Sequence, residues 1–508
     1  MEVLVFVLAM VVVGIYLAFA LFEVPPFHVG VLYKQLGFGG ASRDPVAFLG
    51  EPGYQPQLKM PSTIRHAVPL IYVRTHHPWP HVEPDKIGYV IANIGKPLPP
   101  GRKYGKYKEQ FELFTNTTAF ASEGRKGLQQ KVLPPGFLGP IHPVAFTVVT
   151  KSRVFGIMTD PKLAEKQAKG ELSYTDFGFN ADDFELLTIP PKKMGLVTCM
   201  DGPPLPPDAV ACRIGGFEDM RTKENELLRT HGINREDPFA TRQDKEHDLG
   251  NDLFEHILRS NNNLHENFQN LEKFFDLGGT MGPQFYPIGE GKYAFHRRII
   301  SVEVVGLVEV MPGEVRAIRA GLGLPRKDIT DRKFVYGGIV QPGYMGTWCV
   351  TLRQGMYLLH DRILELHKAQ TNVLTLFWNP KTSAHKLDEN LTSIKAYSRD
   401  GVEMSFDIDA LVVIREEAVP LMIASFGGME GFVDFMGAQM EGFTTRAINE
   451  READEIIDNL KDVRIKLRDQ MTEGLKKFNI DIQDIIIQEA RGSNEYMKGR
   501  EAKAIAIA

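Results

Sequence analysis

Three histidines lie close together in the segment Thr75 to His81, which reads THHPWPH. Imidazole nitrogens are common zinc ligands, so His76, His77 and His81 are candidates for the metal site of a metal-dependent hydrolase. The spacing opposes this chemistry, because adjacent side chains of an extended chain point apart and the alternate prolines keep the segment extended. No cysteine or acidic pair nearby completes a set of ligands. A solvated linker or a joint between modules is therefore favoured, and no metal is predicted.

The three cysteines, Cys199, Cys212 and Cys349, lie within or near apolar segments that are typical of strands. A buried cysteine behaves as a small apolar residue, and none of the three belongs to a Cys-x-x-Cys pair. The GxSxG and HExxH motifs are absent, and Tyr286 stands where a Walker loop ending at Gly291-Lys292 needs its first glycine. The sequence thus predicts no catalytic residue, no cofactor and no enzymatic activity.

The composition describes a chain of several ordinary domains. Its 508 residues exceed what one hydrophobic core organises, and the length favours about three or four domains. With 43% hydrophobic and 24% charged residues, it is neither a multi-span membrane protein nor a disordered chain. The 59 basic and 64 acidic residues give a net charge of −5, which offers no electrostatic argument for binding nucleic acid.

One segment departs from this average: Val3 to Phe22, with Val12 near its centre, contains no charge and no proline. As a helix it spans about 30 Å, the thickness of a bilayer hydrocarbon core. We therefore predict a transmembrane anchor over residues 1–23. A signal peptide is the alternative, because Ala18-Phe19-Ala20 resembles a cleavage site.

The charges beside this segment bear on its orientation. No lysine or arginine precedes the apolar run, whereas Lys34 and Arg43 follow it. The positive-inside rule then favours a single-pass protein whose bulk faces the cytoplasm.

A proline followed four residues later by a glycine recurs along the chain. The pairs are Pro26 with Gly30, Pro84 with Gly88, Pro191 with Gly195 and Pro342 with Gly346. Proline favours strand starts, glycine favours tight turns, and valine and isoleucine between them favour strands. We therefore predict three serial β-modules, over residues 24–82, 83–187 and 188–336.

The third module carries an insertion at residues 221–275 that is rich in charge and asparagine. Apolar residues recur at helical spacing in two runs, which are Leu249, Leu253 and Ile257, then Leu264, Phe268, Leu271 and Phe275. Two amphipathic helices are predicted, and a solvated loop is the alternative.

Residues 337–490 change from strand to helix and back to strand. Val402 to Val412 alternate with polar residues after the hairpin turn Asp400-Gly401. A long amphipathic helix follows, with an apolar stripe interpreted as an assembly surface and formed by Ile456, Leu460, Val463, Leu467, Met471 and Leu475. Residues 479–490 read as a strand, and residues 491–508 as the start of a C-terminal helix or coiled coil.

These features together resemble a known family. A Gly-x-Tyr turn, a strand ending near Trp378, the Ser-x-Asp-Gly hairpin and a helix with spaced arginines at Arg446, Arg464 and Arg468 are similar to the SPFH or band 7 family, which includes stomatins, prohibitins and flotillins. The resemblance covers residues 337–490. The earlier β-modules are only loosely similar to the tandem repeats of major vault protein.

The apolar segment, the repeat and the resemblance together predict an α+β fold: a transmembrane helix, serial small β-rich modules, and a C-terminal SPFH domain leading into a helix. The resemblance implies a membrane-anchored homo-oligomeric scaffold that forms rings or cages and organises membrane microdomains or partner membrane proteins. Its expected partners are membrane lipids, further copies of the chain and a membrane protease or other membrane protein. Two alternatives are kept: an adaptor or regulator of a membrane protease that docks through residues 221–275, and a membrane-bound metal-dependent hydrolase.

Overall fold

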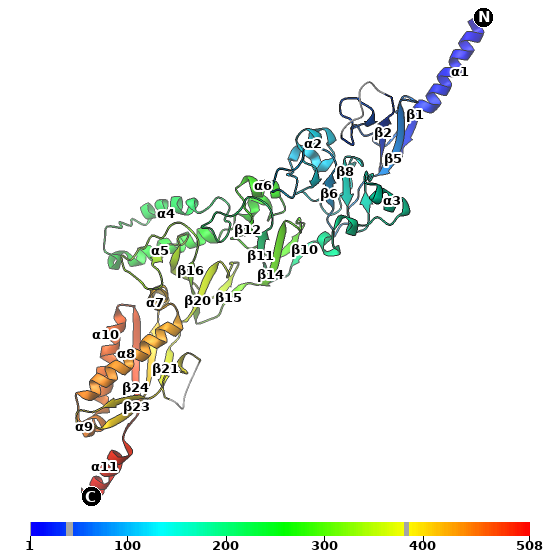
Figure 1. Ribbon diagram of the computed structural model, residues 1–508. Coiled ribbons are helices and arrows are strands. Elements are labelled where there is room, and N and C mark those ends of the chain that lie inside the picture. The colour runs from blue at the N-terminus through cyan, green and yellow to red at the C-terminus, as the bar shows by residue number, and fades with distance from the viewer. Residues whose placement is uncertain (1, 37–43, 380–385, 508) are drawn as a thin grey trace. The chain divides into compact units, whose positions relative to one another are not determined.

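The computed structural model describes residues 2–36, 44–379 and 386–507 (Figure 1). The chain divides into two compact units, each described here by itself. Unit 1 comprises residues 1–214 and 261–306, and unit 2 comprises residues 215–260 and 307–508. The mixed α+β composition predicted from the sequence is confirmed.

Helix α1 (Glu2–Ala20) contains most of the apolar run and ends two residues before its predicted boundary. Leu21 and Phe22 belong instead to β1 (Leu21–Val24), which pairs antiparallel with β4 (Ser62–His66). The side chains from Val5 to Phe19 are exposed. Among the described residues, no single helix has both the length and the hydropathy needed to cross a membrane; Val5–Ala20 is a shorter apolar helix.

Unit 1 then contains three β-modules of the same construction, called here the first, second and third copies. The first copy contains β2 (His28–Lys34), β3 (Gly53–Tyr54) and β5 (Tyr72–Pro78). The second contains β6 (Tyr89–Ala92), β7 (Gly127–Leu128), β8 (Phe146–Val149) and β9 (Val154–Phe155). The third contains β11 (Lys193–Cys199), β12 (Gly282–Pro283) and β14 (Ile300–Gly306), with the outer pair β10 (Leu187–Ile189) and β13 (Gly291–Tyr293). In each copy the first long strand lies between the other two, and all pairs are antiparallel.

The three copies share one strand register. In the first three predicted pairs the glycine forms an isolated β-bridge with an equivalent residue, in the pairs Gly30–Lys59, Gly88–Leu133 and Gly195–Ile288. Glycine is needed because neighbouring side chains fill the space above it: a Cβ at Gly195 would lie 2.5 Å from Val302 Cγ1. The repeated glycines therefore mark strand positions where the core approaches the backbone.

In each copy a glutamine side chain closes a turn, an arrangement named the glutamine staple. The turn lies six residues before the bridge partners Lys59, Leu133 and Ile288. Each copy has a glycine with positive φ there, namely Gly53 (135°), Gly127 (99°) and Gly282 (109°). A glutamine two residues later donates its Nε2–H groups to the carbonyls four and two residues before it, at 3.3 and 3.0 Å for Gln55, 2.8 and 2.7 Å for Gln129, and 3.0 and 2.8 Å for Gln284. The side chain thus holds the turn that leads into the second strand.

Short helices close the cores of unit 1. They are η1 (Glu109–Phe114), α2 (Thr117–Glu123), α3 (Pro161–Lys169), η2 (Tyr174–Phe177), η3 (Ala181–Phe184), η4 (Asn262–His265) and α6 (Leu271–Asp276). In the second copy, Phe111, Phe114 and Phe120 pack fully buried against Phe146 of β8. Aromatic packing therefore compensates for the small size of each sheet.

Unit 2 contains a fourth copy, which begins at Val310, inside the segment 188–336 that was assigned to the third module and before the domain start predicted at residue 337. Strand β16 (Glu314–Ala320) lies between β18 (Gly346–Leu352) and β20 (Leu364–Gln370), and Arg316 faces Leu352 in the register of Gly30 and Lys59. The remaining strands are β15 (Val308–Val310), which pairs with β19 (Gly355–Tyr357), and β17 (Ile339–Val340), which runs parallel to β18.

Gly346 therefore has a different place in the repeat from Gly30. Its φ is 138°, and it stands six residues before Leu352, as Gly53 stands before Lys59. Trp348 replaces the staple glutamine, since its Nε1–H donates to the Tyr344 carbonyl four residues earlier at 3.1 Å. The proline–glycine spacing misplaced this copy because Arg316 occupies the position of the glycine.

The insertion belongs to both units. Residues 215–260 form α4 (Glu218–Thr230) and α5 (Phe239–Leu258) in unit 2, and the following residues form η4 and α6 in unit 1. Leu249, Leu253 and Ile257 are buried on α5 as an amphipathic helix requires. The second predicted helix is interrupted, because residues 266–268 have positive φ between η4 and α6.

The rest of unit 2 is a sheet covered by helices (Figure 1). Its strands are β21 (Leu374–Trp378), β22 (Ile394–Tyr397), β23 (Glu403–Ile414) and β24 (Ile480–Gly492). β24 pairs with β23 along nearly its whole length, so β21 and β22 share the opposite edge. The helices are η5 (Lys386–Asp388), η6 (Glu416–Ala418), α7 (Val419–Phe426), α8 (Met429–Asn449), α9 (Ala453–Asp458), α10 (Leu460–Lys476) and α11 (Asn494–Ile507).

Two apolar segments of these helices pack into the core of unit 2. Residues 416–426 and 429–449 have the composition of a membrane span only as a pair bent by 80°, and buried side chains of α7 and α8 belong to the core. The predicted long helix is two helices, since Asn459 departs from helical angles between α9 and α10. The stripe interpreted as an assembly surface, from Ile456 to Leu475, packs into the same core, with Leu460 partly buried.

Candidate functional site

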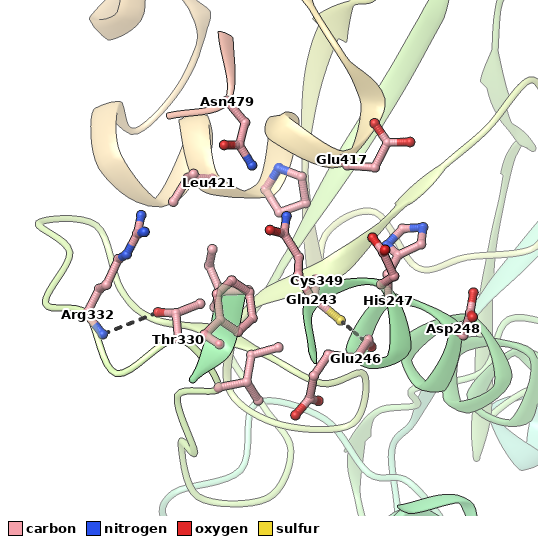
Figure 2. Close-up of a pocket in the computed structure, with 15 residues that line it drawn as sticks. Gln243, Glu246, His247, Asp248, Thr330, Arg332, Cys349, Glu417, Leu421 and Asn479 are labelled. Atoms are coloured by element: carbon pink, nitrogen blue, oxygen red, sulfur yellow. Dashed lines mark hydrogen bonds between the residues drawn. The ribbon is translucent and has the colours of Figure 1, made fainter. Parts of the chain in front are cut away.

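A cavity of about 330 Å³ lies within unit 2, between α5, the fourth copy and the start of α7 (Figure 2). Helix α5 contributes Phe239, Gln243, Asp244, Glu246, His247 and Asp248. The fourth copy contributes Ile329, Thr330, Arg332, Ile339 and Cys349, and the C-terminal part contributes Glu417, Pro420, Leu421 and Asn479. Three segments far apart in sequence thus meet at one site.

The cavity wall is acidic on one side. Figure 2 shows His247 of α5 near Glu417 of η6, with Arg332 on the opposite side of the cavity. The carboxylates of Asp244, Asp248 and Glu417 outnumber the single guanidinium of the lining. The site suits a cationic or amide-bearing group better than an anion.

A buried polar network fixes α5 behind this wall. Glu246, 1% exposed, accepts a hydrogen bond from Gln341 Nε2 at 2.7 Å and one from Arg242 Nε at 3.3 Å. Arg242 Nη2 in turn donates to the Ile329 carbonyl at 2.9 Å. Because a buried carboxylate is costly without partners, this network specifies how α5 lies on the fourth copy.

The network continues to α4. Glu224, 1% exposed, forms an ion pair with Arg235 at 2.5 Å and accepts a hydrogen bond from the Tyr344 hydroxyl. Burial, together with the adjacent Glu224 carboxylate, raises the pKa of Tyr344. Two helices of the insertion are thus attached to one turn of the fourth copy.

The thiols are poorly suited to nucleophilic chemistry. Burial, with a contribution from Glu246, raises the pKa of Cys349, whose Sγ donates to Gln341 Oε1 at 3.2 Å. Burial also raises the pKa of Cys199 to about 12. Since the thiolate is the reactive form, both cysteines are held in their unreactive state at neutral pH. Cys349 therefore does not supply the cavity with a thiolate nucleophile at neutral pH.

The histidines of the segment THHPWPH have separate surroundings. His76 and His77 are adjacent on β5, His77 Nε2 lies 3.1 Å from Thr75 Oγ1, and His81 pairs with Leu138 of the second copy. Burial is the main cause that lowers the pKa of His76 and of His77. Within the described residues, no group of three or more histidine, cysteine, aspartate or glutamate side chains is arranged to hold a metal ion.

Sequence reasoning missed the polar residues that join elements. Arg242 and Glu246 lie four apart on one helix face, which was a readable signal for an ion pair but not for its burial. His142 and His296 each lie four residues before the last long strand of their copy, so their shared position was also readable. Both carry a lowered pKa because they are buried, to about 4 for His142 and about 3 for His296.

Comparison with known proteins places a family boundary at the fourth copy. Residues 312–508 match the family model described as SPFH domain / Band 7 family. The match starts two residues after Val310 and includes the fourth copy and the helix-covered sheet, which is less than half of the chain. No curated protein matches the chain, so the likeness of the first three copies to major vault protein repeats stays a prediction. Proteins of this family are in general membrane-associated scaffolds without enzymatic activity.

Proposed function

We propose that the protein is a membrane-anchored, homo-oligomeric scaffold of the SPFH/band 7 type that forms rings or cages and organises membrane microdomains or partner membrane proteins. The observation that carries this proposal is the shared register of four β-modules in one chain, of which only the fourth lies in the family match. Serial copies of one module give an extended surface on which equivalent contacts can repeat.

Helix α1 supports the membrane part of the proposal. Its side chains from Val5 to Phe19 are exposed and are apolar apart from the hydroxyl of Tyr16, which lies 2.9 Å from His66 Nε2. The first copy adds exposed apolar side chains, with Leu49 94% and Leu70 85% exposed. Exposed apolar surface of this extent favours a lipid environment. The basic residues after α1 favour an orientation with the bulk of the chain in the cytoplasm.

Assembly would follow from multivalency. Chains tethered by α1 to one membrane share an orientation and a high local concentration, so weak lateral contacts between copies are sufficient to hold a large oligomer. The apolar stripe of α10 is occupied inside unit 2, so these contacts would use other surfaces.

The test is imaging of the full chain. Protein extracted in mild detergent should show closed rings or cages by electron microscopy and a single high mass by mass photometry. A chain lacking residues 2–20 serves as the comparison, since tethering should raise the assembled fraction. Monodisperse monomers for the full chain at micromolar concentration would contradict the proposal.

A second candidate function is an adaptor that docks a membrane protease or other membrane protein through the insertion. The observation favouring it is an outward stripe on α4, where Arg221, Asn225 and Arg229 are exposed four residues apart. The opposite face carries the buried Met220, Glu224 and Leu227. The helix is therefore anchored on one face and free on the other.

This candidate needs substitutions rather than a deletion. Removing residues 221–275 would leave Gln341 and Tyr344 of the network without partners and would unfold unit 2 for reasons unrelated to docking. The double variant Arg221→Glu with Arg229→Glu keeps the buried face. It should abolish co-purification of a membrane partner while leaving the oligomer intact. Unchanged co-purification would exclude α4 as the docking surface.

A further inference from the structure

A second cavity, of about 400 Å³, lies inside unit 1, where the second and third copies meet. The second copy contributes the loop between β6 and η1, together with Arg125 and Gln130 beside β7, and the third copy contributes Pro203 and Phe275. The loop carries the sequence Pro97-Leu98-Pro99-Pro100, which the third copy repeats as Pro204 to Pro207. In the second copy it continues with Gly-Arg-Lys, in the third with Asp208, so the basic version occurs at this cavity.

The charge of the lining is not balanced. Two lysines are neutralised by neighbours: Lys106 pairs with Asp276 at 2.6 Å, and Lys108 pairs with Glu123. Arg102 and Arg125 have no carboxylate partner within the part of the chain that the structure describes, and Arg125 Nη1 donates only to the Pro97 carbonyl at 3.1 Å. The lining thus keeps two guanidinium groups, whose planar forks match a phosphate.

A buried acceptor faces the same cavity. Gln130 is 4% exposed, and its Nε2 donates to Asp201 Oδ2 at 3.3 Å. The carboxylate fixes the orientation of this amide, because only the nitrogen end can donate to it. Gln130 Oε1 is then left buried without a donor among the described residues. An unmet acceptor of this kind requires an N–H or O–H group from a ligand or a water.

Apolar side chains form the remainder of the lining. Leu98, Pro99 and Pro203 present aliphatic surface, and the rings of Tyr104 and Phe275 lie beside them. Tyr104 is fixed in place, since its ring packs edge-on against His296 with centroids 5.0 Å apart. Phe275 is held by Gly202, where a Cβ would lie 2.5 Å from Phe275 Cε1. The cavity therefore combines a flat apolar wall, one deep acceptor and two free guanidinium groups.

We infer that this cavity binds a nucleoside monophosphate, with the phosphate on Arg102 and Arg125, the base against Phe275 and Leu98, and a base N–H on Gln130 Oε1. The volume is within the range of small-ligand sites. The phosphate supplies the charge that the arginines lack, and a base supplies both the flat apolar face and the donor. The ligand would join the second copy to the third and would stiffen unit 1 when bound.

The test is titration of the full chain in detergent with AMP, GMP, CMP and UMP, followed by calorimetry or ligand-detected NMR. At least one nucleotide should bind saturably. Arg102→Ala and Arg125→Ala should each weaken it about tenfold or more, because each removes a charge-assisted contact. Gln130→Leu should also weaken binding, and Lys103→Ala, a basic neighbour outside the lining, should not.

Two simpler ligands separate the parts of the site. Inorganic phosphate and ribose 5-phosphate carry the anion without the base and should bind at least tenfold more weakly than the best nucleotide. Equal affinity for either would overturn the assignment of a nucleoside. Absence of binding for all four nucleotides, or equal losses in Lys103→Ala and Arg102→Ala, would overturn the site itself. Arg102 is exposed and Arg125 is half-buried, so their variants remain informative if Gln130→Leu fails to fold.

Discussion

His142 of the second copy lies against the backbone of the first copy, with its Nε2 3.0 Å from the Gln55 carbonyl oxygen. Its Nδ1 accepts hydrogen bonds from the backbone N–H groups of Val144 and Ala145, both at 3.2 Å. Nδ1 is therefore unprotonated, and Nε2 carries the proton that Gln55 accepts. A neutral imidazole thus joins two modules through the same glutamine that staples the turn of the first.

Because His142 is buried as a neutral imidazole, we predict that unit 1 loses stability in acid. Burial lowers the pKa of His142 from 6.5 to about 4, so the folded state disfavours the proton that the unfolded state takes up. The stabilisation is complete above pH 6.5 and is lost as the pH falls towards 4, an effect on the order of 3 kcal/mol. Thermal unfolding between pH 4 and pH 8 should show a falling Tm below pH 6.5. His142→Asn should reduce this slope; an unchanged slope in that variant would assign it to other groups, such as His296 or His265.

The glycine at the repeat position should not tolerate a side chain. A Cβ at Gly195 would lie 2.5 Å from Val302 Cγ1 and 2.8 Å from Ile189 Cδ1. We expect Gly195→Ala to lower the free energy of unfolding by about 1–3 kcal/mol through overpacking. Gly306→Ala is the matched control, since it lies in the same sheet with nothing within 4 Å of its Cβ position. Chemical denaturation measures both, and similar losses would show that crowding is not the cause.

The buried network of unit 2 should be sensitive to loss of one carboxylate. Glu246→Ala leaves the buried Arg242 guanidinium without this carboxylate and removes one of the two acceptors of Gln341 Nε2, which we expect to cost about 3–5 kcal/mol. Glu226→Ala removes a carboxylate of an exposed pair with Lys223 and should leave stability nearly unchanged. Thermal unfolding of both variants, followed by circular dichroism, compares them. A small effect for Glu246→Ala would mean that water replaces the lost carboxylate.

Introducing one charged residue into α1 tests whether this helix attaches the chain to a membrane. Val12 lies near the middle of the helix and is exposed. A lysine there should disfavour insertion by about 3 kcal/mol and move the chain into the soluble fraction. Flotation of membranes on a density gradient gives the readout, with Leu70→Lys as a control on exposed apolar surface outside α1. Retention of Val12→Lys at the membrane would assign attachment to another surface.

Much of the secondary structure could be predicted from the periodicity of apolar residues. The contacts that join one element to another could not. The alternation from Val402 to Val412 predicted a half-buried strand, and β23 has that pattern, because strand spacing is a local property. The fourth copy was misplaced because Arg316 removed the glycine on which the spacing depended, while its strand register was unchanged. The cavity of unit 2 draws on α5, β18 and Asn479, which only the tertiary fold brings together. The sequence did not show the role of Gln55 for the same reason. Its side chain closes a turn and its carbonyl accepts a hydrogen bond from His142, and both contacts depend on the tertiary fold.

The equivalent histidine of the third copy, His296, is also buried, but neither of its ring nitrogens has a hydrogen-bond partner among the described residues. The first and second copies meet through a glutamine turn of one and a histidine of the other. A recombination event between the codons of the equivalent residues Gly30 and Gly88 would remove residues 30–87, among them Gln55, and His142 would lose this partner. Because Gly30 and Gly88 hold the same strand position, such an event would shorten the chain by one copy without changing the strand register of the copies that remain.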